Sequence, residues 1–186
     1  MNADTAIATD AQVLDFWFGE LQPAQWWKKD AALDARIAAR FGATLAAAKA
    51  CELADWRDTS RGRLAEVIVL DQFSRNVFRD RAEGFAADAI ALALAQEMVR
   101  AGADRALAVA ERAFVYLPYM HSESAAIHRH ALRLFDQPGL ESNLDFERRH
   151  WAIIERFGRY PHRNAILGRA STPEELAFLQ QPGSSF

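Results

Sequence analysis

One segment, RGRLAEVIVLDQFSRNVFR at residues 61–79, constrains the fold most, because it places polar side chains where a helix should be wholly apolar. At 100° per residue, Leu64 and Ile68 share one face, and apolar residues also cover the opposite side, as in a buried helix. Asp71 and Arg75 fall in the middle of the first face. Each unpaired polar group there would cost on the order of 1–3 kcal/mol. The pattern indicates a closed internal network or a pocket that needs these groups. The polar residues concerned are Asp71, Gln72, Arg75 and Asn76.

The bulk properties of the chain limit its size class and its partners. With 186 residues, of which 51% are hydrophobic, we expect a single all-helical domain over residues 1–186 with a substantial core. The formal net charge of −3 gives no overall basic field, so we expect no nucleic-acid partner. No apolar run approaches the roughly 20 residues that a bilayer requires, so we expect no membrane partner. The start MNADTAIATDAQ lacks a secretory-signal pattern, and the single cysteine, Cys51, cannot form an internal disulfide, which predicts a cytoplasmic location.

The periodicity predicts an all-α fold. Alanine is abundant, β-branched runs are rare, and apolar residues recur at intervals of three and four. We expect about seven to nine helices, stacked as antiparallel pairs in an α-solenoid without a clean internal repeat. Asp10 is expected to cap the first helix, and Ser122 the helix that begins at residue 123. The expected helices span residues 11–18, 25–50, 61–79, 85–100, 104–120, 123–136 and 143–157, followed by a short one that begins at Pro173.

A second polar insertion occurs in the expected helix 143–157. Apolar residues such as Phe146 place His150 at the centre of their shared face. A lone histidine in such a position is more often a satisfied core residue than a functional group. Asp71 and Arg75, spaced i, i+4, can likewise form an ion pair that only ties helices together. The functional alternative is an anion-binding arginine held by its aspartate.

Two further polar segments lie at helix breaks. In YLPYMHSES, residues 116–124, His121 can act as a general acid or base with Glu123 as its partner. The alternative is that Glu123 only helps to cap a helix while His121 is exposed. The compact basic segment RFGRYPHRN, residues 156–164, can bind a phosphate or a carboxylate, or can simply be a solvated loop. Its candidate anion-binding residues are Arg156, Arg159, His162 and Arg163.

Other chemistries have weak signals. The pairs His121/Glu123 and His128/His130 match no established zinc spacing and no HExxH motif occurs, so we expect no metal site. Cys51 has no activating base nearby in the sequence. The absence of a glycine-rich phosphate loop and of a GxSxG elbow excludes the simplest nucleotide-kinase and α/β-hydrolase classes. No cofactor can be assigned.

Four segments in this order, VLDFWFGE, VLDQFSRNVFR, YLPYMHSES and RFGRYPHRNAILGR, resemble the family called domain of unknown function 924. The resemblance covers nearly the whole chain. It implies an all-helical fold similar to the tetratricopeptide-repeat superfamily, and it implies no activity. Asn164 enters through the resemblance alone. The residues to which the family points are Asp71, Gln72, Arg75, Asn76, His121, Glu123, His150, Arg159, His162, Arg163 and Asn164.

Three hypotheses for function follow. The first is a pocket for a small anionic ligand, in which Arg75 and Arg163 bind charge while His121 or His150 transfers a proton, as in an enzyme. The second is a protein- or peptide-binding module that uses the groove of the stacked helices. The third is that the buried polar groups form a purely structural network. An exposed tryptophan at position 26 or 27 would equally suit a homodimer contact.

Overall fold

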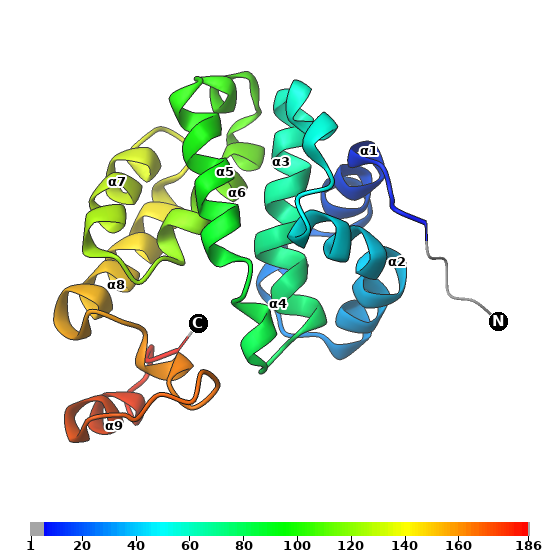
Figure 1. Cartoon of the computed structure of the whole chain (residues 1–186). Helices are drawn as coiled ribbons and strands as arrows, with labels where there is room; N and C mark the ends of the chain where they lie inside the picture. The colour runs from blue at the N-terminus through cyan, green and yellow to red at the C-terminus, as the bar shows by residue number, and fades with distance from the viewer. Residues whose placement is uncertain (1–5, 186) are drawn as a thin grey trace.

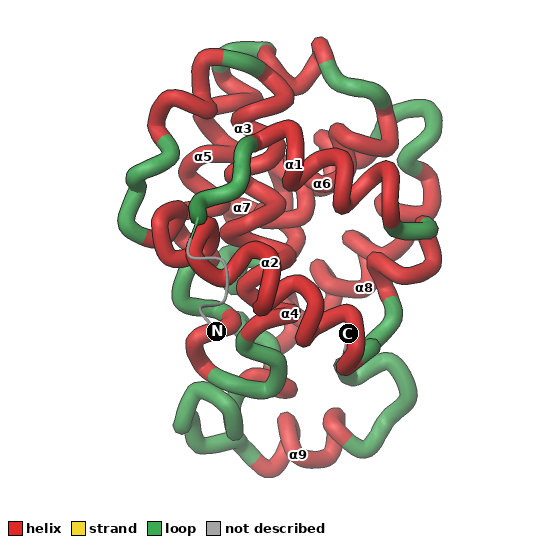
Figure 2. Tube along the Cα trace, turned by 90° about the vertical axis from the view of Figure 1, so that its right-hand side faces the viewer, coloured by secondary structure: helices red, strands yellow, loops and turns green. Residues whose placement is uncertain are grey.

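The computed structural model describes residues 6–185, and in that part of the chain the regular structure is helical, with no strand. Figure 1 and Figure 2 show these helices and the loops between them, which confirms the predicted all-α class. The prediction about a signal segment falls partly on residues 1–5, which lie outside the described residues. The α-helices are α1 (Asp10–Leu14), α2 (Ala31–Lys49), α3 (Ser60–Ile68), α4 (Ser74–Val77), α5 (Asp88–Arg100), α6 (Val109–Met120), α7 (Ala125–Phe135), α8 (Glu141–Phe157) and α9 (Pro173–Leu179).

From α5 to α8, helices that follow one another in the chain pack side by side, whereas alternate helices pack together near the N-terminus, and the helices form a curved layer (Figure 1). Helix α5 contacts α6, α6 contacts α7, and α7 contacts α8, while α1 packs on α3 and α2 packs on α4. This arrangement is compatible with the stacked pairs of an α-α superhelix. Helix α9 lies at the lower edge of the molecule in both views (Figures 1 and 2). In residues 6–185, no helix combines the length and the apolar character that crossing a bilayer requires.

Aromatic side chains pack the N-terminal segments against the central helix and α6. Phe16 and Phe41 are fully buried, with ring centroids 5.0 Å apart. Trp17 packs edge-on against Phe73 and Phe114 at 5.6 and 5.7 Å. Such pairs contribute about 0.5–1.5 kcal/mol each beyond the burial of their area. The aromatic residues that follow residue 15 thus belong to the core at Phe16 and Trp17.

The helix expected over residues 25–50 begins later than predicted. The first tryptophans belong to a separate 3-10 turn, Pro23–Trp27. Helix α2 begins after Asp30, whose carboxylate accepts hydrogen bonds from two backbone N–H groups of the first turn at 2.9 and 3.2 Å. Because this cap separates the turn from the helix, Trp27 does not lie on the apolar face of α2, as the expected helix 25–50 implied. Its side chain is 58% exposed.

Two predicted caps are wrong. Thr9, and not Asp10, caps α1, because Thr9 and Gln12 form a reciprocal capping box that satisfies two backbone donors. Helix α7 begins after Ser124, because Ser122 Oγ accepts the backbone N–H of Ser124 in the preceding turn. In both cases, neighbouring polar side chains compete for the same free backbone N–H groups, and the apolar periodicity does not decide which one binds them.

Other helix ends shift by a few residues. The 3-10 turns Ala82–Gly84 and Ala103–Ala106 precede α5 and α6, which therefore begin at Asp88 and Val109. Helix α8 begins at Glu141, before the expected residue 143. The predicted stops are confirmed where glycine adopts the left-handed conformation, at φ 69° for Gly102 and 67° for Gly158. The box of Thr172 and Glu175 caps α9 as its sequence suggests.

A π-helical turn, Val69–Phe73, interrupts the central helix between α3 and α4. A π turn carries one more residue than an α turn, so side chains beyond it point in different directions from those of a straight α-helix. The 100° wheel therefore fails as a guide beyond Ile68. Asp71 lies inside this turn and is only 1% exposed. The segment is thus buried as predicted, but with a geometry that the periodicity does not contain.

The start of α3 has no room for a side chain at Gly62. A Cβ atom there would lie 2.0 Å from the carbonyl oxygen of Trp56, whereas a Cβ at Gly42, within α2, would meet nothing within 4 Å. We expect Gly62→Ala to lower the free energy of unfolding by about 1–3 kcal/mol. Gly42→Ala should raise it by about 0.5–1 kcal/mol, because alanine favours a helix. Urea denaturation of both variants measures the difference, and equal midpoints would contradict the described packing.

Candidate functional site

The carboxylate of Asp71 is the centre of a buried polar cluster. Its Oδ1 atom lies 2.7 Å from His121 Nδ1 and 3.1 Å from Arg75 Nη1, and its Oδ2 accepts a hydrogen bond from Gln72 Nε2 at 2.5 Å. Arg75 also donates to the backbone carbonyl of Asp71 at 2.5 Å. Burial alone would raise the pKa of Asp71, but the charge of Arg75 and the hydrogen bonds from His121 and Gln72 outweigh it and lower the pKa. Asp71 is therefore ionised.

The ionised Asp71 fixes the tautomer of His121. A carboxylate only accepts hydrogen bonds, so the proton lies on Nδ1 of His121 and Nε2 is left with its lone pair. Burial and the charge of Arg75 lower the pKa of His121, so the ring is neutral near neutral pH. Among the described residues, Nε2 of His121 makes no hydrogen bond. A neutral imidazole held in this way by an aspartate can accept a proton.

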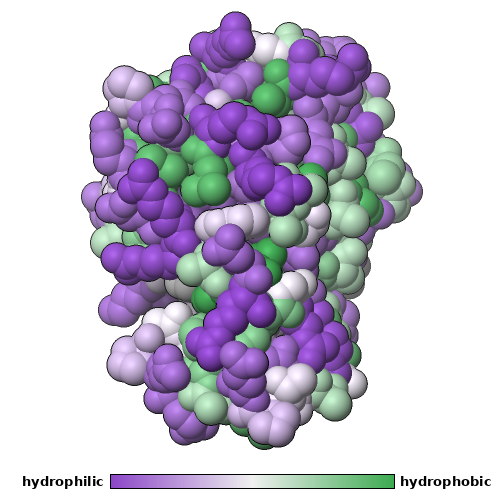
Figure 3. All heavy atoms as spheres, turned by 90° about the vertical axis from the view of Figure 1, so that its left-hand side faces the viewer, coloured by the Kyte–Doolittle hydropathy of each residue, from purple (hydrophilic) through white to green (hydrophobic). Residues whose placement is uncertain are grey.

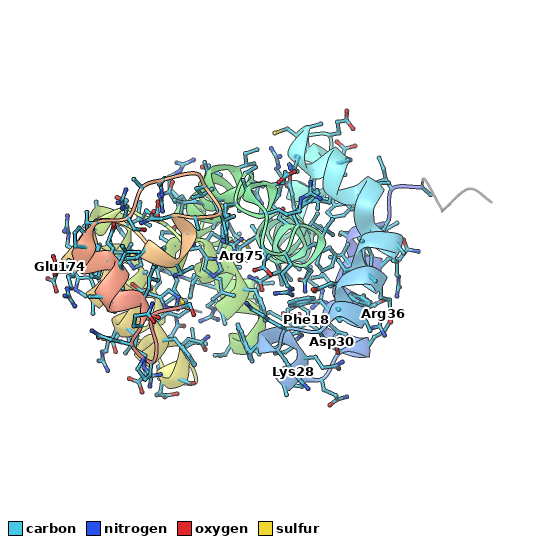
Figure 4. All side chains as sticks on the ribbon, turned by 90° about the horizontal axis from the view of Figure 1, so that it is seen from below. Phe18, Lys28, Asp30, Arg36, Arg75 and Glu174 are labelled. Atoms are coloured by element: carbon cyan, nitrogen blue, oxygen red, sulfur yellow. The ribbon has the colours of Figure 1, made fainter. Side chains whose placement is uncertain are left out.

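Two arginines share one oxygen of Asp88. Arg75 Nη2 lies 3.1 Å from Asp88 Oδ2, and Arg163 Nη1 lies 3.4 Å from the same atom. Both guanidinium groups also lie over the ring of Phe85, at 5.8 and 4.7 Å. Burial and the charge of Asp71 raise the pKa of Asp88, whereas burial and the charge of Arg75 lower that of Arg163. Figure 4 shows Arg75 between the N-terminal and C-terminal parts of the molecule.

Tyr160 connects two further histidines, His150 and His162, to this cluster. Its ring lies 5.7 Å from the ring of His150 and 5.5 Å from that of His162, and Arg163 lies 4.6 Å above it. Nδ1 of His150 lies 2.8 Å from the carbonyl oxygen of Phe146. Because a carbonyl oxygen only accepts hydrogen bonds, Nδ1 carries the proton and donates it to this bond. The predicted burial of His150 is confirmed, but Phe146, expected beside it, is 47% exposed.

Glu123 does not pair with His121, so that prediction is wrong. Its carboxylate accepts hydrogen bonds from Arg169 at 2.6 and 2.9 Å and from the backbone N–H of Tyr160 at 2.7 Å. Arg169 arrives from the segment after α8, where sequence spacing gave no reason to expect a partner. The role of Glu123 is therefore to hold this segment, and Asp71 takes the place expected for it beside His121.

Three other predicted ligand-binding residues lie in pairs of their own. Asn76 donates to Asp34 at 2.8 Å. Arg159 binds Glu175 through two hydrogen bonds of 2.6 and 2.8 Å, and Asn164, fully buried, donates to a serine at 3.0 Å. The exposed Arg156 likewise pairs with a glutamate of α9. The residues that the fold does gather around Arg75 and Tyr160 are Asp71, Gln72, His121, His150, His162 and Arg163.

Sequence reasoning missed Asp88 and Tyr160. Asp88 is the first residue of an alanine-rich helix, where an acidic side chain is ordinary because it faces the positive end of the helix dipole. Tyr160 is fully buried in the basic loop, and its hydroxyl donates to the carbonyl of Met120 at 2.5 Å. The sequence did contain a signal for Tyr160: a large aromatic residue between Gly158 and Pro161, in an otherwise basic loop, indicates a buried side chain. Groups of three or more His, Cys, Asp or Glu side chains able to hold a metal do not occur in residues 6–185.

The paired helices and the buried cluster of charged side chains define an all-helical protein with an internal polar site. The family model described as bacterial protein of unknown function (DUF924) matches residues 13–183, and the chain belongs to this family. Its structure is similar to that of a protein of unknown function, ATU0120, from Agrobacterium tumefaciens, with a TM-score of 0.88 and 40% identity over 92% of this chain and 96% of that chain. No curated protein matches the chain. The family expected from the sequence is confirmed.

The burial of His150 gives a test by pH. Desolvation lowers its pKa from 6.5 to about 3, so between these values the unfolded chain binds a proton that the folded chain does not. The free energy of unfolding should therefore fall as pH falls through this window, by up to about 1.4 kcal/mol per pH unit for this group. We expect His150→Gln to remove this contribution. Urea denaturation from pH 7 to pH 4 measures it, with the exposed His130→Gln as control. The same slope in His150→Gln and the wild type would show that His150 is not held neutral.

Proposed function

We propose that this protein binds a small carboxylate-bearing ligand between Arg75 and Arg163, and that His121 exchanges a proton with it. The observation that carries the proposal is the single oxygen of Asp88 that both arginines share. Arginine usually binds a carboxylate through two oxygens and two N–H groups. Arg163 Nε is buried and has no hydrogen-bond partner in residues 6–185. The two guanidinium groups therefore carry donors that Asp88 does not use.

The charges of the cluster support a ligand with one negative charge. Two arginines face two aspartates, while His121 is neutral, so the cluster is balanced when Asp88 is ionised. Because its pKa is raised, Asp88 takes up a proton more easily than a free aspartate, and its protonation would leave one positive charge without a counterion. A bound carboxylate would supply this counterion. Binding would then be coupled to proton uptake by Asp88.

The pair of Asp71 and His121 supports proton transfer as the chemistry. Asp71 holds Nδ1–H of His121 at 2.7 Å, which leaves Nε2 as the proton acceptor. General acid–base groups of this kind typically contribute about 10²–10⁴-fold to a rate. In such an enzyme, the arginines would position the ligand and His121 would move the proton.

A ligand could reach the cluster from solvent, because three of its side chains are partly exposed. The exposed fraction is 21% for Arg75, 22% for Asp88 and 16% for His121. These three groups can meet a ligand from solvent, whereas the side chain of Arg163 is only 8% exposed. The pocket expected from the sequence stays a prediction, and two surface hollows of the molecule lie near Gln137 instead.

The alternative of a protein- or peptide-binding module also stays a prediction. One observation favours it: Trp27 is exposed and stacks on Phe114 with ring planes only 5° apart and centroids at 5.8 Å. The other large exposed apolar side chains come from different elements. The face that Figure 3 shows is largely hydrophilic, with scattered hydrophobic groups. A peptide groove is therefore less well supported than the charged cluster. The exposed apolar residues are Ile7, Trp27, Val109, Phe146 and Leu176.

The competition between Asp88 and a ligand can be measured by calorimetry with acetate and lactate as ligands. We expect Arg163→Gln to weaken binding about tenfold, since a hydrogen bond to a charged group is worth roughly 1.5–3 kcal/mol. Asp88→Asn should strengthen binding, because it removes the competing carboxylate. It should also abolish the proton uptake that buffers of different ionisation enthalpy reveal for the wild type.

The neutral isostere acetamide and the variant Arg156→Gln serve as controls, since Arg156 is exposed and pairs with Glu174 away from the cluster. Acetamide should not bind, and Arg156→Gln should behave as the wild type. If the network is purely structural, Arg163→Gln and Asp88→Asn will lower the free energy of unfolding while wild type and variants alike fail to bind either acid. That result would overturn the proposed function.

A further inference from the structure

A surface hollow of about 270 Å³ lies between the C-terminal end of α5, the turn Ala103–Ala106, α6 and α7. Val99 lines it, whereas Asp88 of the candidate site lies at the other end of α5. Eleven residues of α-helix span about 16 Å, so the hollow is separate from the candidate site. The charged side chains that line the hollow are Asp104, Arg105, Arg112 and Arg133.

Arg112 is the most constrained of these side chains. Its Nη1 donates to Gln137 Oε1 at 2.6 Å, and its Nη2 donates to the carbonyl of Leu107 at 3.1 Å. Both acceptors are neutral. Its Nε atom is buried and has no hydrogen-bond partner in the described part of the chain. A partly buried guanidinium without a carboxylate is unfavourable, so this group is set up for an anion that the chain itself does not provide.

The one carboxylate in the hollow is already engaged. Asp104, 5% exposed, accepts the hydroxyl hydrogen of Tyr116 at 2.6 Å. Burial and this hydrogen bond raise the pKa of Tyr116, so the tyrosine keeps its proton. Within residues 6–185, the ion pairs include most arginines, but none of them involves Asp104 or an arginine of the hollow. Three positive charges and one negative charge leave a surplus of two.

We propose that this hollow binds the phosphate group of a small molecule. A phosphate monoester carries a charge of about −1.5 to −2 at neutral pH, which matches the surplus, whereas a single carboxylate carries half as much. The planar fork of arginine suits phosphate oxygens, and the buried Nε of Arg112 offers a further donor. The hollow is smaller than the roughly 300–1,000 Å³ typical of pockets for drug-sized ligands. A compact ligand, either inorganic phosphate or a small phosphate ester, therefore fits it.

The experiment is calorimetry at neutral pH with inorganic phosphate and with glycerol phosphate as separate ligands. The double variant Arg105→Gln/Arg133→Gln removes two exposed charges and leaves the hydrogen bonds of Arg112 in place. We expect its dissociation constant for the better ligand to rise at least about tenfold. Tighter binding of inorganic phosphate identifies the free ion as the ligand, and tighter binding of glycerol phosphate identifies an ester.

Two single variants provide the controls. Arg149→Gln removes an arginine of α8 that lies over Phe146 and forms no ion pair in the described residues, so it tests the effect of net charge alone. Arg163→Gln removes an arginine of the candidate carboxylate site. Phosphate binding should be unchanged in both. The proposal is overturned if the wild type binds neither ligand at millimolar concentration, if the double variant binds like the wild type, or if Arg163→Gln abolishes binding. Acetate binding by the double variant reports separately on the proposed function.

Discussion

The buried carboxylate of Asp71 is the interaction on which the rest of the site depends. A charged group in the interior costs several kcal/mol unless it is well paired, and Asp71 meets this cost with donors from Gln72, Arg75 and His121. The π turn places it where it can reach all of them. Through His121 it fixes the end of α6, and through Arg75 and Asp88 the start of α5. One ionised group thus sets the relative positions of three helices, and the geometry of the candidate site follows from theirs.

Much of this could be predicted from the sequence, because polar residues on apolar faces are visible in periodicity. That signal found Asp71, Arg75 and His150, and the helix breaks found His121 and Arg163. The pairings could not be predicted, since they depend on tertiary packing: His121 has Glu123 two residues away, yet its partner is Asp71, 50 residues earlier. Asp88 could not be predicted as a site residue, because an acidic side chain is ordinary in the first turn of a helix. The predicted helix ends were wrong where 3-10 or π turns replaced the expected α-helical turns. These turns differ from an α-helix only by small changes in the backbone, which the apolar periodicity does not reveal.

Most of the predicted residues outside the cluster support the segment that follows α8; Asn76, which pairs with Asp34, is the exception. Glu123 binds Arg169, and Arg159 binds Glu175, each through two hydrogen bonds. The pair of Glu123 and Arg169 fastens the segment that follows α8 onto the helical body, whereas Arg159 and Asn164 make their hydrogen bonds within that segment and hold its shape. Because Arg163 belongs to that segment, its approach to Asp88 depends on them. Apart from Asn76, the polar residues to which the family points therefore divide into those that form the cluster and those that hold the segment carrying one of its arginines.

The distance along the chain between Asp88 and Arg163, 75 residues, has a consequence for synthesis on the ribosome. Once the helices up to α6 have emerged, they can bring Asp71, Arg75 and Asp88 together, with two negative charges against one positive charge. At about 5–20 residues per second, Arg163 follows Asp88 out of the ribosome by on the order of 4–15 s. During that interval the nascent cluster has an unbalanced charge and an open side. The site is thus completed only after α7 and α8 have been synthesised.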